Sequence, residues 1–166
     1  MRNLAALCLI ISLLLACAAA CSRDSDPGSQ TAKRYVQSQG YKVTKVRGLV
    51  EKYTLDRAKL YGETSTLPYR QSWGVQTARP EDYFGQDILI YAFTVKGHPL
   101  ENIYRVNTNV YIMLSGGKVI GGYSFPDATG LAGAVYSLDG KTLEEVTGLS
   151  FREWQDQWKR KYGDGS

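Results

Sequence analysis

The sequence predicts an α+β fold, in which an antiparallel β-sheet with hairpins is covered by helices. Apolar and β-branched segments flank the pair Gly116 and Gly117, and a similar turn signal occurs at Asp139 and Gly140. Glycines tolerate the positive φ angles of the tight turns that join neighbouring antiparallel strands. The chain lacks the strand and helix alternation that is typical of parallel sheets. We therefore expect at least three antiparallel strands within a single α+β domain over 30–166.

The first sixteen residues resemble a secretory signal peptide. A short positive segment with Arg2 precedes an apolar run from residue 4 to residue 16. Apolar side chains of this kind partition into the bilayer, while the positive charge stays on the cytoplasmic side. We therefore assign residues 1–16 to a signal peptide.

The residues before Cys17 resemble the lipid-attachment pattern of bacterial lipoproteins. In that pattern an aliphatic, a variable and a small residue precede the cysteine that receives a diacylglycerol, as in Leu-Leu-Ala-Cys here. We expect Cys17 to carry the lipid, with Cys21 as the alternative. Two further interpretations stay open: an ordinary secretory signal that is cut after Ala20, and an uncleaved membrane helix.

A flexible tether is predicted over 17–29, and a short helix follows it. The polar end of the tether contains Pro27 and Gly28 and has no apolar side chain to bury, which is typical of a linker. The helical pattern covers 30–39. Ser29 is its expected N-cap and the glycine after it is its expected stop.

The next segments predict one strand and several short elements. β-branched and aromatic residues favour a strand over 41–55, with a bulge at Gly48. One helical turn is expected over 56–61. Weak patterns predict a loop over 64–70 and an extended segment over 73–77.

The middle of the chain predicts the main strands of the sheet. Residues 87–96 are apolar on both faces of a strand, so we expect a central strand there. The segments 110–114 and 118–124 form the first predicted hairpin. A second hairpin is predicted from 134–138 and 141–146.

The segment 150–162 predicts an amphipathic C-terminal helix that closes the core. Ser150 and Glu153 have the spacing of a capping box, in which each side chain bonds the backbone of the other residue. Aromatic residues share one helical face: Phe151, Trp154 and Trp158. Basic residues near the end suit the helix dipole.

The composition excludes several kinds of chemistry. All three cysteines lie at or before residue 21, so the domain can have no disulfide, thiol nucleophile or thiolate metal site. The single histidine, His98, lies between glycine and proline, and we expect an exposed turn residue there. We therefore predict no metal, no cofactor and no catalytic residue, and thus a protein that is not an enzyme. A formal net charge of +4 is too small to indicate nucleic acid as a partner.

One candidate ligand surface can be assembled from aromatic and polar residues. It would join Tyr69, Arg70 and Trp73 with Asp127 in the loop 125–130, because exposed aromatic rings suit sugar rings and peptides. The chain also contains 12 tyrosines. Tyrosines suit half-buried strands as well as binding surfaces.

Two segments resemble an uncharacterised lipoprotein family of Gram-positive bacteria, and they run from Val110 to Pro126 and from Tyr136 to Trp154. The resemblance implies a position on the outer face of the cytoplasmic membrane and supplies no activity and no site residue. The two Gly-Lys turns in these segments are also similar to those of propeptide-like modules that regulate extracellular peptidases.

Together these features predict a lipid-anchored protein on the extracytoplasmic face of the cell membrane. Its domain would be a non-enzymatic binding or accessory module. The expected partners are the membrane, through the lipid, and an envelope protein or wall polymer. A propeptide-like regulator or inhibitor of an extracellular peptidase is the alternative function.

Overall fold

The computed structural model describes residues 26–128 and 134–163. Its helices, 3₁₀ helices (η) and strands are, in chain order, α2 (Pro27–Ser38), β1 (Lys42–Thr54), η1 (Arg57–Leu60), η2 (Thr64–Thr66), α3 (Leu67–Gly74), η3 (Pro80–Tyr83), β2 (Asp87–Lys96), α4 (Leu100–Tyr104), β3 (Thr108–Ser115), β4 (Lys118–Pro126), β5 (Tyr136–Ser137), α5 (Leu143–Thr147) and α6 (Phe151–Tyr162). The predicted signal peptide 1–16, Cys17 and Cys21 lie outside the described residues. Within those residues, no helix has both the length and the hydropathy needed to cross a membrane.

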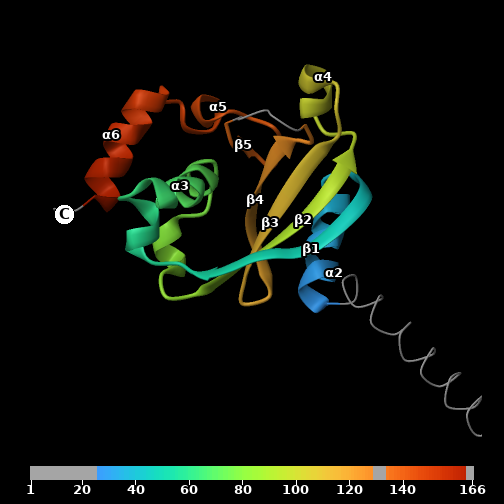
Figure 1. The fold of residues 1–166 in the computed structure, drawn as a ribbon, viewed down its shortest axis with the longest axis horizontal. Helices are drawn as coiled ribbons and strands as arrows, with labels where there is room; N and C mark the ends of the chain where they lie inside the picture. Colours follow the sequence, from blue (N-terminus) through green and yellow to red (C-terminus); the bar gives the residue numbers. More distant parts are fainter. Residues whose placement is uncertain (1–25, 129–133, 164–166) are drawn as a thin grey trace, which may run out of the picture.

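The five strands form one antiparallel sheet in the order β1-β2-β3-β4-β5, so each strand pairs with its neighbour in the chain (Figure 1). This arrangement confirms the α+β prediction. Gly116 and Gly117 connect β3 to β4 with φ angles of 55° and 75°, which glycine adopts at little cost. Strand β2 lies between β1 and β3 and is buried along most of its length, as predicted for a central strand.

The edge strand β1 is irregular along its length. Its pairing with β2 shifts register at three places, one of them between Val46 and Gly48. This shift confirms the predicted bulge at Gly48. Bulges increase the twist of an edge strand and limit its pairing with other chains.

Helix α2 covers one face of the sheet (Figure 1). Ala32 and Val36 are fully buried in a core cluster with residues of β2 and β3: Tyr91, Phe93, Val95, Val110, Ile112 and Leu114. Burial of side chains from a helix and a sheet against each other is the main favourable contribution to such a fold.

Helix α2 begins three residues earlier than predicted. The carboxylate of Asp26 accepts hydrogen bonds from the amides of Gly28 and Ser29 at 3.4 and 3.2 Å, so Asp26 is the N-cap and Ser29 is a buried helical residue. The last three residues of the predicted tether, from Pro27 to Ser29, therefore belong to the domain. Proline fits the first turn because its missing N–H has no helical partner there.

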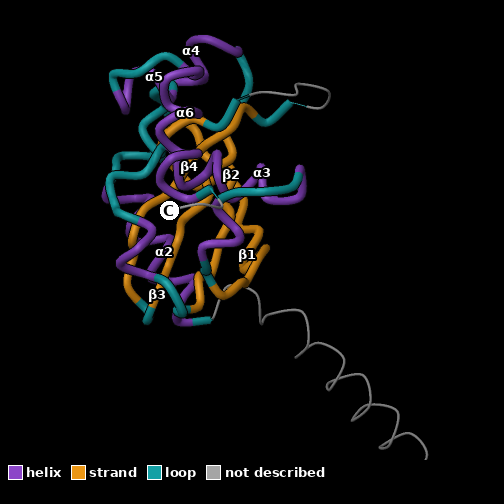
Figure 2. The backbone as a smooth tube through the Cα atoms, turned by 90° about the vertical axis from the view of Figure 1, so that its left-hand side faces the viewer, coloured by secondary structure: helices purple, strands orange, loops and turns teal. Residues whose placement is uncertain are grey.

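The opposite face of the sheet is covered by α3 and the 3₁₀ helices, with α6 on their outer side (Figures 1 and 2). A second core lies between these layers: Tyr53, Leu55, Leu60, Trp73, Ile88, Ile90, Met113 and Tyr162. Helix α6 thus closes the core as predicted through Tyr162 and Trp158. It rests on η1 and α5 because α3 already occupies this face of the sheet.

Two segments differ from their predicted conformation. Residues 67–74 form α3 instead of a loop and an extended segment, with Pro68 in the first turn. Residues 143–147 form α5 instead of a hairpin strand, because Thr142 and Glu145 make a capping box that starts a helix. The second predicted hairpin is therefore replaced by the short strand β5, which pairs with β4.

Candidate functional site

Helix α3 sends the predicted ligand residues in different directions. Trp73 is 2% exposed, and its Nε1 donates to the hydroxyl of Tyr53 at 3.0 Å inside the second core. Tyr69 packs edge-on against Tyr53 with ring centroids 4.7 Å apart. Arg70 instead lies over the ring of Tyr61. Trp73 is therefore a core residue and not part of an exposed surface, which corrects that part of the prediction.

Asp127 belongs to a polar row at the end of β4. It accepts from Asn109 Nδ2 at 2.8 Å and forms an ion pair with Arg47 at 3.3 Å. The hydroxyl of Thr94 donates to Asn109 Oδ1 at 2.8 Å, which extends the row to β2. The partners of Asp127 thus come from the sheet and not from α3. The predicted loop 125–130 is described only as far as its fourth residue.

The region between α3 and α6 contains the candidate ligand site. Trp154 of α6 borders three cavities in this region, with volumes of about 360, 270 and 160 Å³. The largest lies between α6 and the segment 73–80. The second is lined by the first turns of α5 and α6, and the smallest lies beside Tyr61 and Arg70. We call this region the α3–α6 cleft.

An aromatic ladder along α6 forms the shared wall of the cleft. Its ring centroids are 5.9 Å apart between Phe151 and Trp154, and 5.0 Å apart between Trp154 and Trp158. Tyr162 continues the ladder at 4.6 Å from Trp158. The spacing of three or four residues places these rings on one helical face. The indole of Trp158 is fixed by a hydrogen bond from Nε1 to the carbonyl of Leu60 at 2.6 Å.

Polar side chains line the largest cavity beside these rings: Gln76, Thr77, Arg79, Thr147, Gln157 and Lys161. At one end, Lys161 Nζ lies 2.7 Å from Glu81 Oε1, which also accepts from the Tyr162 hydroxyl at 2.9 Å. Burial opposes the charge of Glu81, but the hydrogen bond from Lys161 helps to outweigh it, so the pKa of Glu81 lies below its usual value. Burial raises the pKa of Tyr162 to about 12. This end of the cleft therefore keeps its charges at neutral pH.

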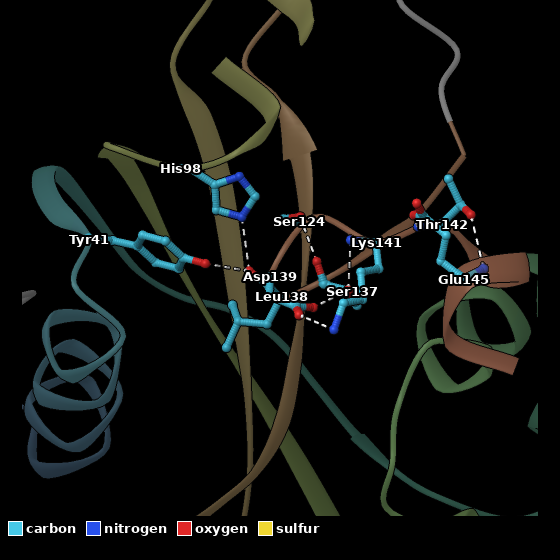
Figure 3. A network of polar contacts seen from close by, with 9 residues as sticks. All are labelled: Tyr41, His98, Ser124, Ser137, Leu138, Asp139, Lys141, Thr142 and Glu145. Carbon is cyan, nitrogen blue, oxygen red and sulfur yellow. Dashed lines mark hydrogen bonds and ion pairs between the residues drawn. The ribbon is translucent and has the colours of Figure 1, made fainter. Parts of the chain in front are cut away.

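The single histidine belongs to a structural network beside β5 (Figure 3). His98 is 2% exposed, and its Nδ1 accepts from the amide of Leu100 at 3.1 Å. Nε2 therefore carries the proton and donates to the carbonyl of Leu138 at 2.9 Å, to which the Tyr41 hydroxyl also donates at 3.3 Å. The prediction of an exposed turn residue is wrong. Because backbone groups engage both ring nitrogens, the ring has no free nitrogen to accept a proton from a substrate.

The turn after β5 completes this network (Figure 3). The hydroxyl of Ser137 donates to Asp139 Oδ1 at 2.5 Å and accepts from the amide of Lys141 at 2.9 Å. Lys141 also forms an ion pair with Asp139 at 2.8 Å. These bonds hold the turn that leads from β5 into α5.

The placement of potential metal ligands in the described residues and the comparisons with known proteins identify no further site. Across 26–128 and 134–163, no three histidine, cysteine, aspartate or glutamate residues are placed to hold a metal ion. No protein-family model matches the chain, and no curated protein or solved structure matches it either. The fold and the cleft thus define a single α+β domain with a meander sheet, covered on both faces, and an aromatic cleft beside it.

The sequence carried only a weak signal for the cleft. The aromatic spacing on α6 indicates a buried helical face as readily as the wall of a cavity. Two of the predicted ligand residues, Arg70 and Trp73, also line cavities of the cleft. The cleft depends on α3, whose helical conformation was not predicted.

Proposed function

We propose that this chain is a lipid-anchored protein of the extracytoplasmic face of the cell membrane, and that its domain is a non-enzymatic binding module. The observation that carries the proposal is the α3–α6 cleft, with aromatic walls, polar groups on its rim and a largest cavity of about 360 Å³. Ligand sites are commonly concave and aromatic, with a few polar groups that fix orientation. The pattern before Cys17 supports the anchor.

The chemistry of the cleft favours a wall polymer as the partner. Flat indole and phenol rings suit the apolar faces of sugar rings. The side-chain amide of Gln157 offers both donors and an acceptor for hydroxyl groups. An envelope protein would instead need a larger continuous surface than these cavities provide.

The position of the N-terminal end of the domain favours an orientation in which the cleft points away from the membrane. Asp26 bonds to Tyr91, which faces α2 on one side of the sheet. Helices α3 and α6, which border the cleft, lie on the opposite side of the sheet (Figure 1). A lipid attached through the N-terminal segment would therefore hold the α2 side toward the membrane and leave the cleft accessible.

The alternative function, regulation of an extracellular peptidase, has less support. It rests on a likeness of two Gly-Lys turns to those of propeptide-like modules. Only the turn at Gly117 forms a hairpin, since the turn at Gly140 leads into α5. The binding module is therefore the function that the geometry supports best.

The anchor is tested by mass spectrometry of the membrane-extracted protein. We expect a diacylglyceryl thioether on Cys17, and loss of membrane association in Cys17→Ser but not in Cys21→Ser. An unmodified N-terminus with intact Cys17 contradicts the proposed anchor.

The binding function is tested with two matched surface variants and isolated cell-wall material. Phe151 lines the cleft and is 46% exposed, whereas Ile103 on α4 is 65% exposed and lies outside the cleft. Replacing either exposed side chain should leave the fold intact. We expect Phe151→Ser to reduce co-sedimentation with the wall material about tenfold while Ile103→Ser leaves it unchanged. Equal binding by both variants would contradict a role for the cleft.

A further inference from the structure

Arg70 has no anionic or hydrogen-bonding partner within the described residues. Its Nε is buried and donates to no acceptor within the described residues. Over the same ranges the guanidinium takes part in no ion pair or other hydrogen bond. Arginine keeps its charge at any physiological pH, and a buried donor without an acceptor is costly. An acceptor group on a ligand beside Arg70 would satisfy this donor.

A cavity lies where such an acceptor would bind. Arg70 lines the smallest cavity of the α3–α6 cleft, whose volume is about 160 Å³, together with rings on two sides. The Arg70 Cζ lies 6.0 Å from the centroid of the Tyr61 ring. This distance allows a cation–π contact that helps to orient the guanidinium plane. The indoles of Trp154 and Trp158 form the other wall.

The charges around this cavity select the kind of ligand. Arg70 and Lys159 contribute two positive charges and Asp156 contributes one negative charge, which leaves one net positive charge. A ligand group with one negative charge would balance it.

The shape of the guanidinium further limits which negatively charged group of a ligand can bind. Its parallel N–H groups match two oxygens on one atom, as in a carboxylate or a phosphodiester. Lys159 adds a flexible point charge that does not impose geometry. Both ligand groups carry one negative charge at neutral pH, in agreement with the net charge of the cavity.

We propose that Arg70, supported by Lys159, binds a singly charged oxyanion, a carboxylate or a phosphodiester, on the ligand of the α3–α6 cleft. This inference rests on the proposed binding function and adds the chemistry of the group that the cleft recognises. The rings of Trp154 and Trp158 border both this cavity and the largest one. A ligand with a ring beside its acidic group can therefore contact the ladder and Arg70 together.

The test uses the full chain in detergent micelles at low ionic strength, where charge recognition is least screened. Binding of galacturonate, of glycerophosphoglycerol and of neutral galactose is measured by NMR titration of the indole N–H signals. The first two probes separate the carboxylate from the phosphodiester. The variants are Arg70→Gln, Arg70→Lys and, as the matched control, Arg160→Gln, which removes the same charge from an exposed position of α6.

We expect one of the two anions to bind at least tenfold more tightly than galactose. Arg70→Gln should weaken that binding about tenfold or more, Arg70→Lys should weaken it in part, and Arg160→Gln should change it less than twofold. The preferred anion identifies the source of the oxyanion. A thermal melt of each variant confirms that it is folded.

The proposal is overturned if neither anion binds better than galactose, or if Arg70→Gln and Arg160→Gln bind alike. Neither result decides whether the cleft binds the wall, which the co-sedimentation of Phe151→Ser and Ile103→Ser tests separately. If Phe151→Ser weakens wall binding as expected but Arg70→Gln does not weaken anion binding, the cleft is still the binding site and only the oxyanion proposal is wrong. If neither Phe151→Ser nor Arg70→Gln changes binding, the cleft is not the binding site.

Discussion

The hydroxyl of Tyr91 donates a hydrogen bond of 2.5 Å to the carboxylate of Asp26. The bond joins a residue of the central strand β2 to the N-cap of α2. Tyr91 is buried in the first core, whereas Asp26 is exposed at the point where the predicted tether reaches the domain. The pair thus fastens the beginning of the domain to its sheet.

Removing this hydroxyl should destabilise the domain mildly and in a pH-dependent way. We expect Tyr91→Phe to lower the free energy of unfolding by about 0.5–1 kcal/mol, because solvent weakens a bond to an exposed carboxylate. The hydrogen bond from Tyr91, aided by the amides of Ser29 and Gly28, holds the pKa of Asp26 below its usual 3.8. The contribution is therefore complete above that value and is lost as pH falls through the pKa of the folded state.

Urea denaturation of the wild type and Tyr91→Phe at about pH 7 and about pH 2 measures this effect. The difference seen near neutrality should vanish in acid. Tyr35→Phe on the same helix is the control, since its hydroxyl has no hydrogen bond within the described residues. An equal loss in both variants would show that the bond to Asp26 contributes nothing.

The buried imidazole of His98 should make the domain less stable in mild acid. Burial lowers the pKa of His98 below its usual 6.5, so the unfolded chain takes up the proton first as pH falls. Stability is therefore complete above about pH 6.5 and declines below it until the folded ring also titrates. Because the chain has only one histidine, its NMR signal reports this pKa directly. A folded-state pKa at or above 6.5 would contradict the prediction.

The variant His98→Asn separates this titration from the others. The wild-type urea midpoint should fall between about pH 7 and pH 5, whereas that of the variant should stay nearly constant. The variant itself should be less stable at neutral pH because the carbonyl of Leu138 loses its imidazole donor. Parallel pH profiles would assign the acid sensitivity to other groups.

Gln76 should contribute more to the stability of the fold than an ordinary surface glutamine does. Its side-chain amide donates to the carbonyl of Gly122 at 3.0 Å and accepts from the amide of Gly122 at 2.9 Å, so it pairs with the edge of β4 next to the residues that pair with β5. We expect Gln76→Ala to lower the free energy of unfolding by about 1–3 kcal/mol, since two backbone groups lose their partner. Exposed Gln37→Ala should cost less than about 0.5 kcal/mol. Comparable urea midpoints for the two variants would refute this role.

Gly74 should be required for the position of Trp154. A Cβ at residue 74 would lie 2.7 Å from Trp154 Cζ2, which is closer than such atoms approach. We expect Gly74→Ala to lower the free energy of unfolding by about 1–3 kcal/mol and to shift the tryptophan fluorescence, because the indole must move. In a Trp154→Ala background the same change should cost much less. An unchanged cost in the double-mutant cycle would show that the two residues are independent.

The strands were predictable because their sequence signals are local. The Gly116 and Gly117 turn requires positive φ angles that few other residues adopt, and β2 is apolar on both faces because both faces are covered. The C-terminal helix was predictable from its capping box for the same reason. The helix α5 carries an equivalent signal in Thr142 and Glu145, but the preceding Asp-Gly turn favoured a hairpin. Here the capping box decided the local structure.

The candidate site was less predictable because it depends on contacts between distant segments. His98 lies in a Gly-Pro setting that is typical of exposed turns, yet the carbonyl of Leu138 and the ring of Tyr41 bury it. Trp73 and Arg70 are three residues apart on α3. Trp73 packs in the second core, whereas Arg70 lies over the ring of Tyr61 and borders the cavity beside α6.

The sequence by itself determined the α+β class, the central strand, the Gly-Gly hairpin and the capped C-terminal helix, since backbone angles and capping bonds depend on neighbouring residues. It also supplied the lipid-attachment pattern at Cys17, which lies outside the described residues. Only the tertiary structure decided that α3 separates α6 from the sheet and that three cavities meet at Trp154. Those outcomes depend on which side chains fill the space between layers, and that is fixed by packing across the whole chain.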